Sequence, residues 1–166
     1  MSMPVDVRSV RRRMVAFSSQ ADVARDLDAL EAAHGSGRLE RLGNHEAGPI
    51  FDHLAMAMER SVDGFPIRAA LFLRLIGPLV KKSVLSKPFQ PGIRLRDSDE
   101  KFAWNDAVTF ERGIASLRAQ IQRAARPEVK ANAAHPFFGK MTPEEWRVYH
   151  LRHGELHLSF LRVRPG

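Results

Sequence analysis

The chain contains no cysteine. Disulfide bonds, thiolate nucleophiles and sulfur-ligated metals are therefore excluded. Any transition-metal site must instead be built from histidine, aspartate and glutamate side chains. The same absence fits a reducing compartment, in which disulfides are rare.

The sequence also lacks an apolar run long enough to cross a membrane. The most apolar stretch, residues 69–80, contains Arg74 and is broken at Pro78, whereas a bilayer span needs about twenty apolar residues. Near the N-terminus, the apolar residues 14–17 end at Ser18, which makes them too short for the apolar region of a secretory signal. We therefore expect a cytoplasmic protein with no membrane partner.

A basic patch of the kind found in nucleic-acid-binding proteins is missing as well. The net charge is +7, but the arginines are spread through every segment and no basic stripe is interleaved with aromatic residues. We therefore expect no nucleic-acid partner. With 44% hydrophobic and 27% charged residues in 166, the composition is globular and the length fits a single domain over residues 1–166.

Five segments carry apolar residues at helical spacing, and none shows the alternation of a β-strand. The expected helices span residues 20–34, 49–62, 66–82, 106–126 and 143–163. The third is the most apolar and contains Pro78, a residue that kinks helices. Residues 86–99 form a long irregular connection, of a kind that often lies over a functional cleft. The sequence therefore predicts a nearly all-α fold.

The last of these helices has the clearest start. Thr142 suits the N-cap position and Pro143 the first helical position. Glu145 occupies the third helical position, from which its carboxylate can accept a hydrogen bond from the backbone of the cap residue. These three residues predict that a helix begins at residue 143.

Three of the seven histidines lie in this last helix. Positions four apart on an α-helix differ by about 40° around the axis and about 6 Å along it, so His153 and His157 can reach one ion. His150 lies on the same side but about 10 Å along the axis from His157, so all three can hardly bind one metal. The pair His150 and His153 remains geometrically possible, although its side chains splay further around the helix.

The histidine face adjoins apolar residues. Leu156 and Phe160 flank it, which indicates that the imidazoles point inward, where a charged imidazolium is costly and a metal-bound neutral imidazole is not. Hydrogen-bonded core histidines, or a solvated edge, are the alternative. Together with His53 on the second expected helix, the spaced pair in a cysteine-free chain favours a metal site.

Two groups of residues carry a resemblance to a known family. Residues 135–146 read HPFFGKMTPEEW and are followed by His153-x-x-x-His157, while residues 50–54 read IFDHL and residues 61–66 read SVDGFP. With these motifs the chain resembles the DinB-like metalloenzyme superfamily. More narrowly, it resembles a DinB-related bacterial family named only as a domain of unknown function. The resemblance runs from about Val10 onward, and its specific parts are residues 43–66 and 135–157.

The resemblance implies a four-helix bundle, with residues 66–82 as an extra helix and the long connection between the second and third bundle helices. It also implies that His53, His153 and His157 bind zinc, nickel or another divalent ion such as iron or manganese. His150 matches no ligand position. Many relatives carry glutamine where this chain has Phe160, so the residues that support the ligands must differ here.

Three protein nitrogens leave a fourth coordination position for water or substrate, and such a metal lowers the pKa of a bound water or thiol. We therefore expect a metal-dependent enzyme acting on a small molecule by thiol transfer or hydrolysis. The resemblance adds a low-molecular-weight thiol as a substrate class. A non-catalytic binding module with a structural metal is the alternative, and a homodimer is left open.

No general base is singled out by the sequence. Asp52, Glu59, His150 and Glu155 lie near the histidine motifs, but each is more easily explained as a surface charge, a packing group or a partner of a ligand. We expect the metal to open on a pocket roofed by residues 88–99 and 135–139. Met58, Tyr149 and Phe160 are expected to make the pocket apolar.

Overall fold

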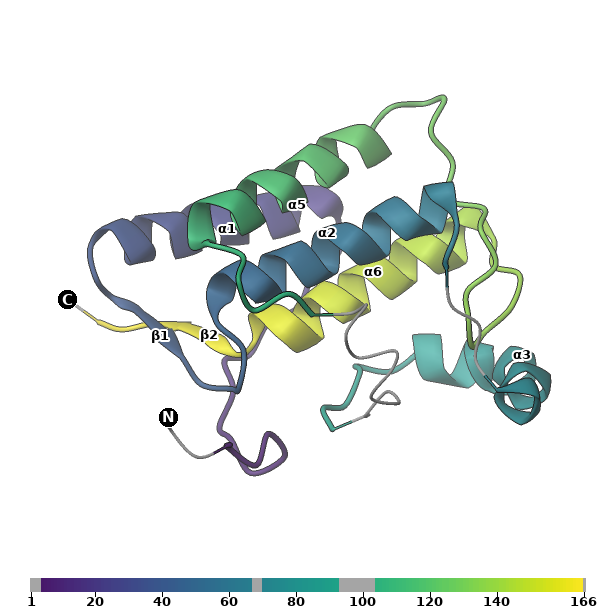
Figure 1. The fold of residues 1–166 in the computed structure, drawn as a ribbon, viewed down its shortest axis with the longest axis horizontal. Coiled ribbons are helices and arrows are strands. Elements are labelled where there is room, and N and C mark those ends of the chain that lie inside the picture. Colours follow the sequence, from purple (N-terminus) through teal and green to yellow (C-terminus); the bar gives the residue numbers. More distant parts are fainter. Residues whose placement is uncertain (1–3, 67–69, 93–103, 166) are drawn as a thin grey trace.

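The structure, a computed structural model, describes residues 4–66, 70–92 and 104–165. In this part of the chain it is mostly helical, with five helices and one sheet of two short strands (Figure 1). The helices are α1 (Gln20–Gly35), α2 (Ala47–Asp63), α3 (Leu71–Leu85), α5 (Phe110–Ala124) and α6 (Pro143–Leu158), and the strands are β1 (Leu39–Arg41) and β2 (Leu161–Val163). No helix in the described ranges combines the length and the apolar character needed to cross a membrane.

Helix α2 lies between α5 and α6, and α1 packs against α5 and α6 (Figure 1). Apolar residues on the facing sides of these four helices form the larger of two cores. Its buried members include Leu27, Leu30, Phe51, Leu54, Leu117, Leu151 and Leu158. The 3.6-residue spacing of apolar positions, which predicted the helices, therefore also predicted which faces are buried.

Two glycines let α2 and α5 approach closely. A Cβ atom on Gly113 would lie 2.3 Å from the carbonyl oxygen of Gly48, and a Cβ atom on Gly48 would lie 2.4 Å from the carbonyl oxygen of Val108. Both distances are far below a van der Waals contact, so the two backbones touch where these residues meet. Any larger residue at either position must push the helices apart.

The largest departure from expectation is at the C-terminal end. Helix α6 ends at Leu158, five residues before the expected end at residue 163, and the chain continues into β2. Strand β2 pairs antiparallel with β1, with Leu39 opposite Val163. Each strand has only three residues, too few for an alternating pattern to stand out. Leu161, in the strand, is fully buried.

Most of the other helix boundaries are closer to expectation, apart from the start of α3. Helices α1 and α2 extend one or two residues beyond the predicted ends, while α5 begins at Phe110 because Thr109 takes the N-cap position. Helix α3 covers Leu71–Leu85 in place of residues 66–82, with Pro78 inside it. Residues 93–99 of the expected connection lie outside the described residues.

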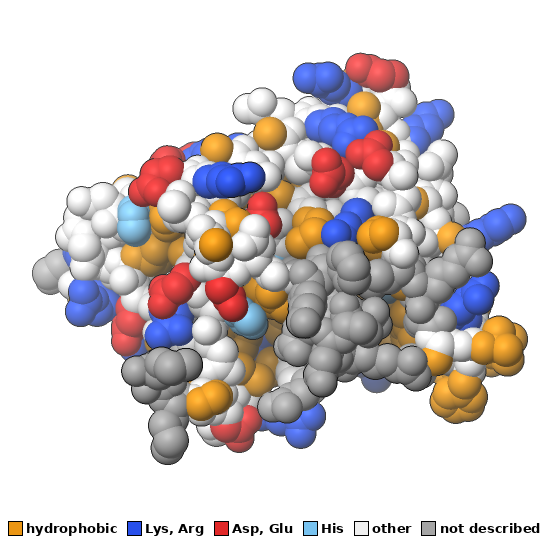
Figure 2. Space-filling view, viewed as in Figure 1, with side chains coloured by type: hydrophobic (Ala, Val, Ile, Leu, Met, Phe, Trp, Pro, Cys, Tyr) orange, Lys and Arg blue, Asp and Glu red, His pale blue; other side chains and the backbone are white. Residues whose placement is uncertain are grey.

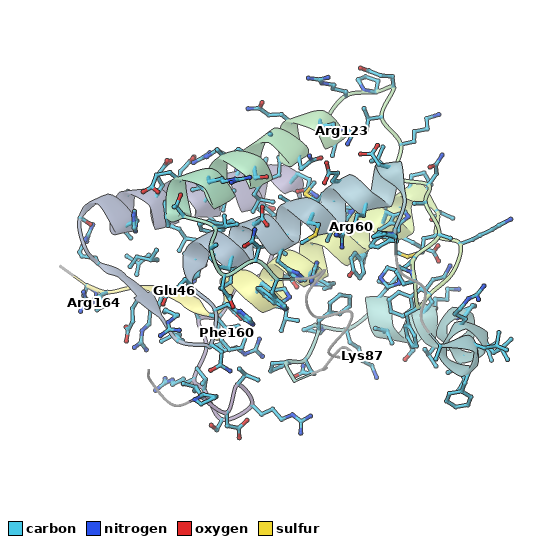
Figure 3. All side chains as sticks on the ribbon, viewed as in Figure 1. Glu46, Arg60, Lys87, Arg123, Phe160 and Arg164 are labelled. Carbon is cyan, nitrogen blue, oxygen red and sulfur yellow. The ribbon has the colours of Figure 1, made fainter. Side chains whose placement is uncertain are left out.

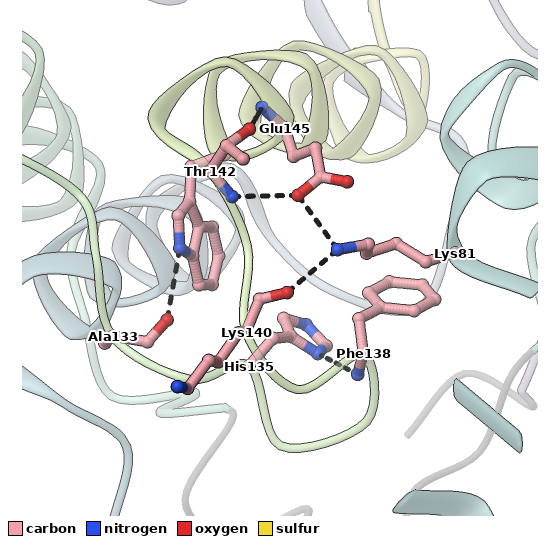
Figure 4. Close-up of polar contacts among 8 residues, drawn as sticks. Lys81, Ala133, His135, Phe138, Lys140, Thr142 and Glu145 are labelled. Carbon is pink, nitrogen blue, oxygen red and sulfur yellow. Dashed lines mark hydrogen bonds and ion pairs between the residues drawn. The ribbon is translucent and has the colours of Figure 1, made fainter. Parts of the chain in front are cut away.

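A second, smaller core lies where α3, the loop before α6 and the first turns of α6 meet. Trp146 is fully buried in it and donates from Nε1 to the carbonyl oxygen of Ala133 over 3.2 Å (Figure 4). Lys81 of α3 donates to the carbonyl oxygen of Lys140 over 2.8 Å and to the carboxylate of Glu145 over 2.9 Å. Helix α6 therefore contributes to both cores.

Charged side chains of both signs are interleaved on the face shown in Figure 2. Several are paired: Arg118 of α5 contacts Asp28 and Glu31 of α1, and Arg123, labelled in Figure 3, contacts Asp63 at the end of α2. Exposed apolar side chains gather on the outer face of α3, where Leu71, Phe72, Leu75 and Leu79 are 66–82% exposed. Among the described residues, α3 is thus held by its inner face alone.

Candidate metal centre

Two helices bring three histidines together. His53 lies in α2, and His153 and His157 lie one turn apart on α6, which packs against α2. The ring centroid of His53 is 4.8 Å from that of His153 and 4.7 Å from that of His157, and the centroids of His153 and His157 are 4.7 Å apart. One nitrogen of each ring lies within 4.8 Å of the other two. The expected closeness of these side chains is therefore confirmed.

The spacing suits one small ion. Zinc binds histidine nitrogen at about 2.0–2.1 Å, so two nitrogens on the same ion lie roughly 3–4 Å apart. The Nε2 atoms of His53 and His153 are 3.0 Å apart. Within the described residues, no carboxylate joins this group. The three histidines could therefore hold a metal ion, and their geometry does not choose among divalent metals.

The surroundings keep the two α6 imidazoles, those of His153 and His157, neutral. Burial lowers the pKa of His153 and of His157 well below the ordinary value of 6.5, and the neighbouring histidine rings lower both further. Neutral imidazole is the form that binds a metal, because a protonated ring has no free lone pair. The apolar neighbours of these histidines predicted that they face the interior. That position favours the neutral imidazole, which is the form that binds a metal.

Trp104, which the sequence did not single out, covers one side of the site. Its indole stacks on the His53 ring at 4.2 Å with an angle of 9°, and meets the His157 ring edge-on at 5.4 Å. The other face of the indole stacks on His45 at 3.6 Å, and His45 Nδ1 is 3.4 Å from a carboxylate oxygen of Asp106. The indole thereby fixes the plane of the His53 ring. Trp104 precedes α5 without any periodic pattern, so only its rarity could have drawn attention to it.

His150 lies outside the three-histidine group. Its Nε2 atom is 3.1 Å from the hydroxyl oxygen of Ser61, and its ring stacks on Trp146. Burial, followed by the effect of His135, lowers the pKa of His150 to about 3. This placement matches the interpretation in which His153 pairs with His157 and not with His150.

The acidic residues near the histidine motifs, considered above as general bases, do not contact the three histidines in a metal-binding arrangement. Glu155 is buried and accepts from the Phe17 backbone N–H over 2.8 Å, and it pairs with Arg152 at 2.8 Å. It therefore ties the N-terminal segment to α6. Glu59 is exposed and Asp52 is half-buried, and neither belongs to the histidine group.

Of the residues expected to line a pocket, Tyr149 lies beside the histidines and Phe160 contacts the N-terminal segment. Tyr149 lies 5.3 Å from the His153 ring and 5.0 Å from the His135 ring, so the 135–139 loop is one aromatic ring away from the site. Phe160, labelled in Figure 3, follows α6 and stacks under the Arg12 guanidinium at 5.3 Å. Much of the other proposed roof, residues 93–99, lies outside the described residues. The pocket stays a prediction.

His135 is held as a neutral acceptor within this loop. Its Nδ1 atom accepts from the backbone N–H groups of Phe137 and Phe138, both over 3.1 Å. Figure 4 shows the bond to Phe138. Burial lowers the pKa of His135 from 6.5 to about 4. The folded protein therefore binds fewer protons than the unfolded chain between these pH values.

Replacing His135 should make stability less sensitive to acid. Because the folded-state pKa is the lower one, stability is lost as the pH falls from about 6.5 to 4. At 1.36 kcal/mol per pH unit, His135 accounts for about 3 kcal/mol at most. His135→Asn keeps an acceptor for the two N–H groups and removes the titration, so its loss of stability between pH 7 and pH 4 should be smaller by up to that amount. Urea unfolding of the metal-free protein over this range measures it.

The control for this experiment is His34→Asn, at a half-exposed histidine on α1. It removes an imidazole outside the 135–139 loop, and the effect of His135→Asn is measured against it. If His135→Asn loses as much stability as the unmodified chain, then His135 already carries a proton in the folded protein at pH 4.

Comparison with known proteins places the chain in a family. The family model described as "Protein of unknown function (DUF1569)" matches residues 9–164. No curated protein and no solved structure matches the chain. The expectation of a family named only as a domain of unknown function is thereby confirmed. The match carries no link to the DinB-like superfamily, which stays a prediction.

Proposed function

The chain belongs to the DUF1569 family of proteins of unknown function, and we propose that it is a divalent-metal-binding protein whose ion is held by His53, His153 and His157. The observation that carries the proposal is the convergence of one nitrogen from each ring to within 4.8 Å. The rings lie at 70–79° to one another, so they meet at their edges, as ligands of one ion do, and do not stack.

The surrounding residues support a site of this kind. Burial keeps His153 and His157 neutral, and Trp104 fixes the His53 ring and excludes water from its outer face. The three ligands come from helices that are rigid elements of the larger core, so little ordering is needed on binding. A bound divalent ion would act as a Lewis acid that lowers the pKa of a coordinated water or thiol.

We further propose that the protein is a metal-dependent enzyme acting on a small molecule, by thiol transfer or hydrolysis. Three protein ligands leave a fourth position for an exchangeable group. The motifs in residues 43–66 and 135–157 resemble the DinB-like superfamily, which includes thiol-dependent transferases and isomerases. A set of three imidazole donors suits zinc or nickel, with iron and manganese as alternatives.

A structural metal in a non-catalytic module is the second candidate. The feature that favours it is Trp104, which covers His53 and His157 from one side and so reduces access. A structural ion contributes directly to the stability of the fold, whereas a catalytic ion keeps an open position. The two candidates therefore differ in what happens when the ion is removed and when a small ligand is added.

The test is a metal-binding experiment on the purified chain. Elemental analysis should find about one divalent ion per chain, and cobalt added after chelation should restore one site. The cobalt spectrum should change on addition of a small thiol or of imidazole, and the chelated protein should stay folded by circular dichroism. A spectrum that no ligand perturbs, together with unfolding on chelation, would favour the structural metal. Failure to bind any divalent ion would overturn the proposal.

We also propose that α1, α2, α5 and α6 form a four-helix bundle of the DinB-like type within a single domain over residues 1–166. The contacts of α2 with α5 and α6, and of α1 with the same two helices, support this arrangement. Helix α3 is then the extra helix between the second and third helices of the bundle.

A further inference from the structure

His153 has one ring nitrogen that the metal centre does not use. Its Nε2 atom faces His53 at 3.0 Å and is therefore the atom placed to bind an ion. A neutral imidazole that binds a metal through Nε2 carries its proton on Nδ1, and metal-bound histidines almost always donate that proton to an acceptor. The Nδ1 atom of His153 is buried and has no hydrogen-bond partner among the described residues. The centre therefore needs an acceptor beside this atom.

A small cavity next to His153 has room for one. Its volume is about 10 Å³, at the lower end of the space that a single water occupies. Of the residues that line it, only Gln20, His150 and His153 have polar side chains. A buried water usually makes about three hydrogen bonds to otherwise unpaired polar groups. The cavity offers that number of polar side chains.

The hydrogen bonds of His150 determine what it presents to this cavity. The hydroxyl of Ser61 donates to the carbonyl oxygen of Met58 over 2.6 Å, so its only proton is used. The Ser61 oxygen must then accept from His150, whose Nε2 atom is 3.1 Å away. His150 is half-buried and neutral, so with its proton on Nε2 its Nδ1 atom is a free acceptor.

We propose that His150 and Gln20 position the metal ligand His153 through a water bound in this cavity. His153 donates from Nδ1–H to the water, and the water donates to Nδ1 of His150. A continuous chain of hydrogen bonds then runs from the Met58 carbonyl through Ser61 and His150 to His153. Because a carbonyl can only accept, the bonds from Ser61, from His150 and from the water to His150 each have one possible direction. The last bond is directed by the metal, which takes Nε2 of His153 and leaves the proton on Nδ1. His150 is thus a positioning residue that orients the water, which in turn accepts from Nδ1–H of His153 and leaves Nε2 free for the ion.

Gln20 completes the water's surroundings from a different helix. It is the first residue of α1 and lines the same cavity. Its side-chain amide has both donors and an acceptor, so it can take whichever hydrogen bond the water has left. The proposal rests on the metal centre proposed above and assigns a role to two residues outside it.

Two substitutions of His150 separate positioning from stability. His150→Gln keeps a donor that can reach Ser61 but loses the acceptor toward the cavity, and it should weaken cobalt affinity 10–100-fold. His150→Asn keeps an acceptor close to the original Nδ1 position and loses the bond to Ser61. It should lower the melting temperature and hold cobalt affinity within about threefold of the unmodified chain. Cobalt titration and thermal unfolding of the metal-free proteins measure the two effects separately.

Gln20→Leu should weaken cobalt affinity by about tenfold, and Gln122→Leu, at an exposed glutamine of α5, is its matched control.

A structure of the metal-loaded chain should place a water within hydrogen-bond distance of Nδ1 of both His153 and His150. If the unmodified chain binds no cobalt, the metal centre fails and this inference fails with it. If it binds cobalt and all four variants bind equally well, or if His153 binds through Nδ1, only the positioning role is overturned.

Discussion

Replacing His153 or His157 by alanine should weaken the binding of a divalent ion by more than a hundredfold, beyond the effect of residues that only support a ligand. Each substitution removes one of three protein nitrogens that converge within 4.8 Å, and two remaining imidazoles cannot enclose an ion. His150→Ala should weaken binding less, because His150 is not one of the three converging histidines and contacts Ser61. Calorimetric titration of the metal-free variants with zinc provides the comparison.

His34→Ala is the control for these three variants. His34 is half-exposed at the end of α1 and stacks on Phe110, away from the centre, so its loss should leave zinc affinity unchanged. If His150→Ala alone abolished binding, then His150 and His153 would be the ligand pair and our choice would be wrong.

Gly113→Ala should destabilise the fold by about 3 kcal/mol or more, at or above the upper end of the usual cost of overpacking. The added Cβ atom would lie 2.3 Å from the carbonyl oxygen of Gly48 and 2.9 Å from its Cα atom. Both atoms belong to backbone, which cannot rotate away as a side chain can. Helices α2 and α5 must therefore separate along the interface that dominates the larger core. Urea unfolding of the metal-free protein should detect the loss.

Gly35→Ala is the matched control, because it adds the same methyl group to a helix without a contact. Within the described residues, no atom beyond the local backbone of α1 and the neighbouring residues lies within 4 Å of a Cβ placed on Gly35. Alanine favours a helix over glycine by about 0.5–1 kcal/mol. This variant should be as stable as the unmodified chain or slightly more so. Equal stability of the Gly113 and Gly35 variants would mean that α2 and α5 are not in backbone contact.

The sequence predicted local features well where neighbouring residues determine them. The Thr142 hydroxyl accepts from the Glu145 backbone N–H over 3.1 Å, and the Glu145 carboxylate accepts from the Thr142 backbone N–H over 2.8 Å. This reciprocal pair was expected from four consecutive residues. The shared face of His153 and His157 follows in the same way from their spacing of four.

Features that depend on distant parts of the chain were missed. The stacking of Trp104 between His45 and His53 places a segment without periodicity against α2 and the residues just before it. Nothing in the sequence around Trp104 predicts this contact. The end of α6 was placed too late because β2 exists only through its pairing with β1, more than a hundred residues earlier. Spacing alone could suggest His53 as a ligand, but its closeness to α6 depends on how two helices pack.

Helix α6 packs into both cores, so it cannot open locally as easily as a helix that belongs to one core. Trp146 belongs to the smaller core and Leu151 and Leu158 to the larger, and the two α6 histidines lie on the same helix. No part of α6 can detach without exposing one of these cores, so its amide hydrogens should exchange with solvent only through the largest opening events of the chain. Helix α3, held by one face, can open in smaller steps. A ligand bound at His153 and His157 would therefore slow exchange across both cores and have less effect on the outer turns of α3.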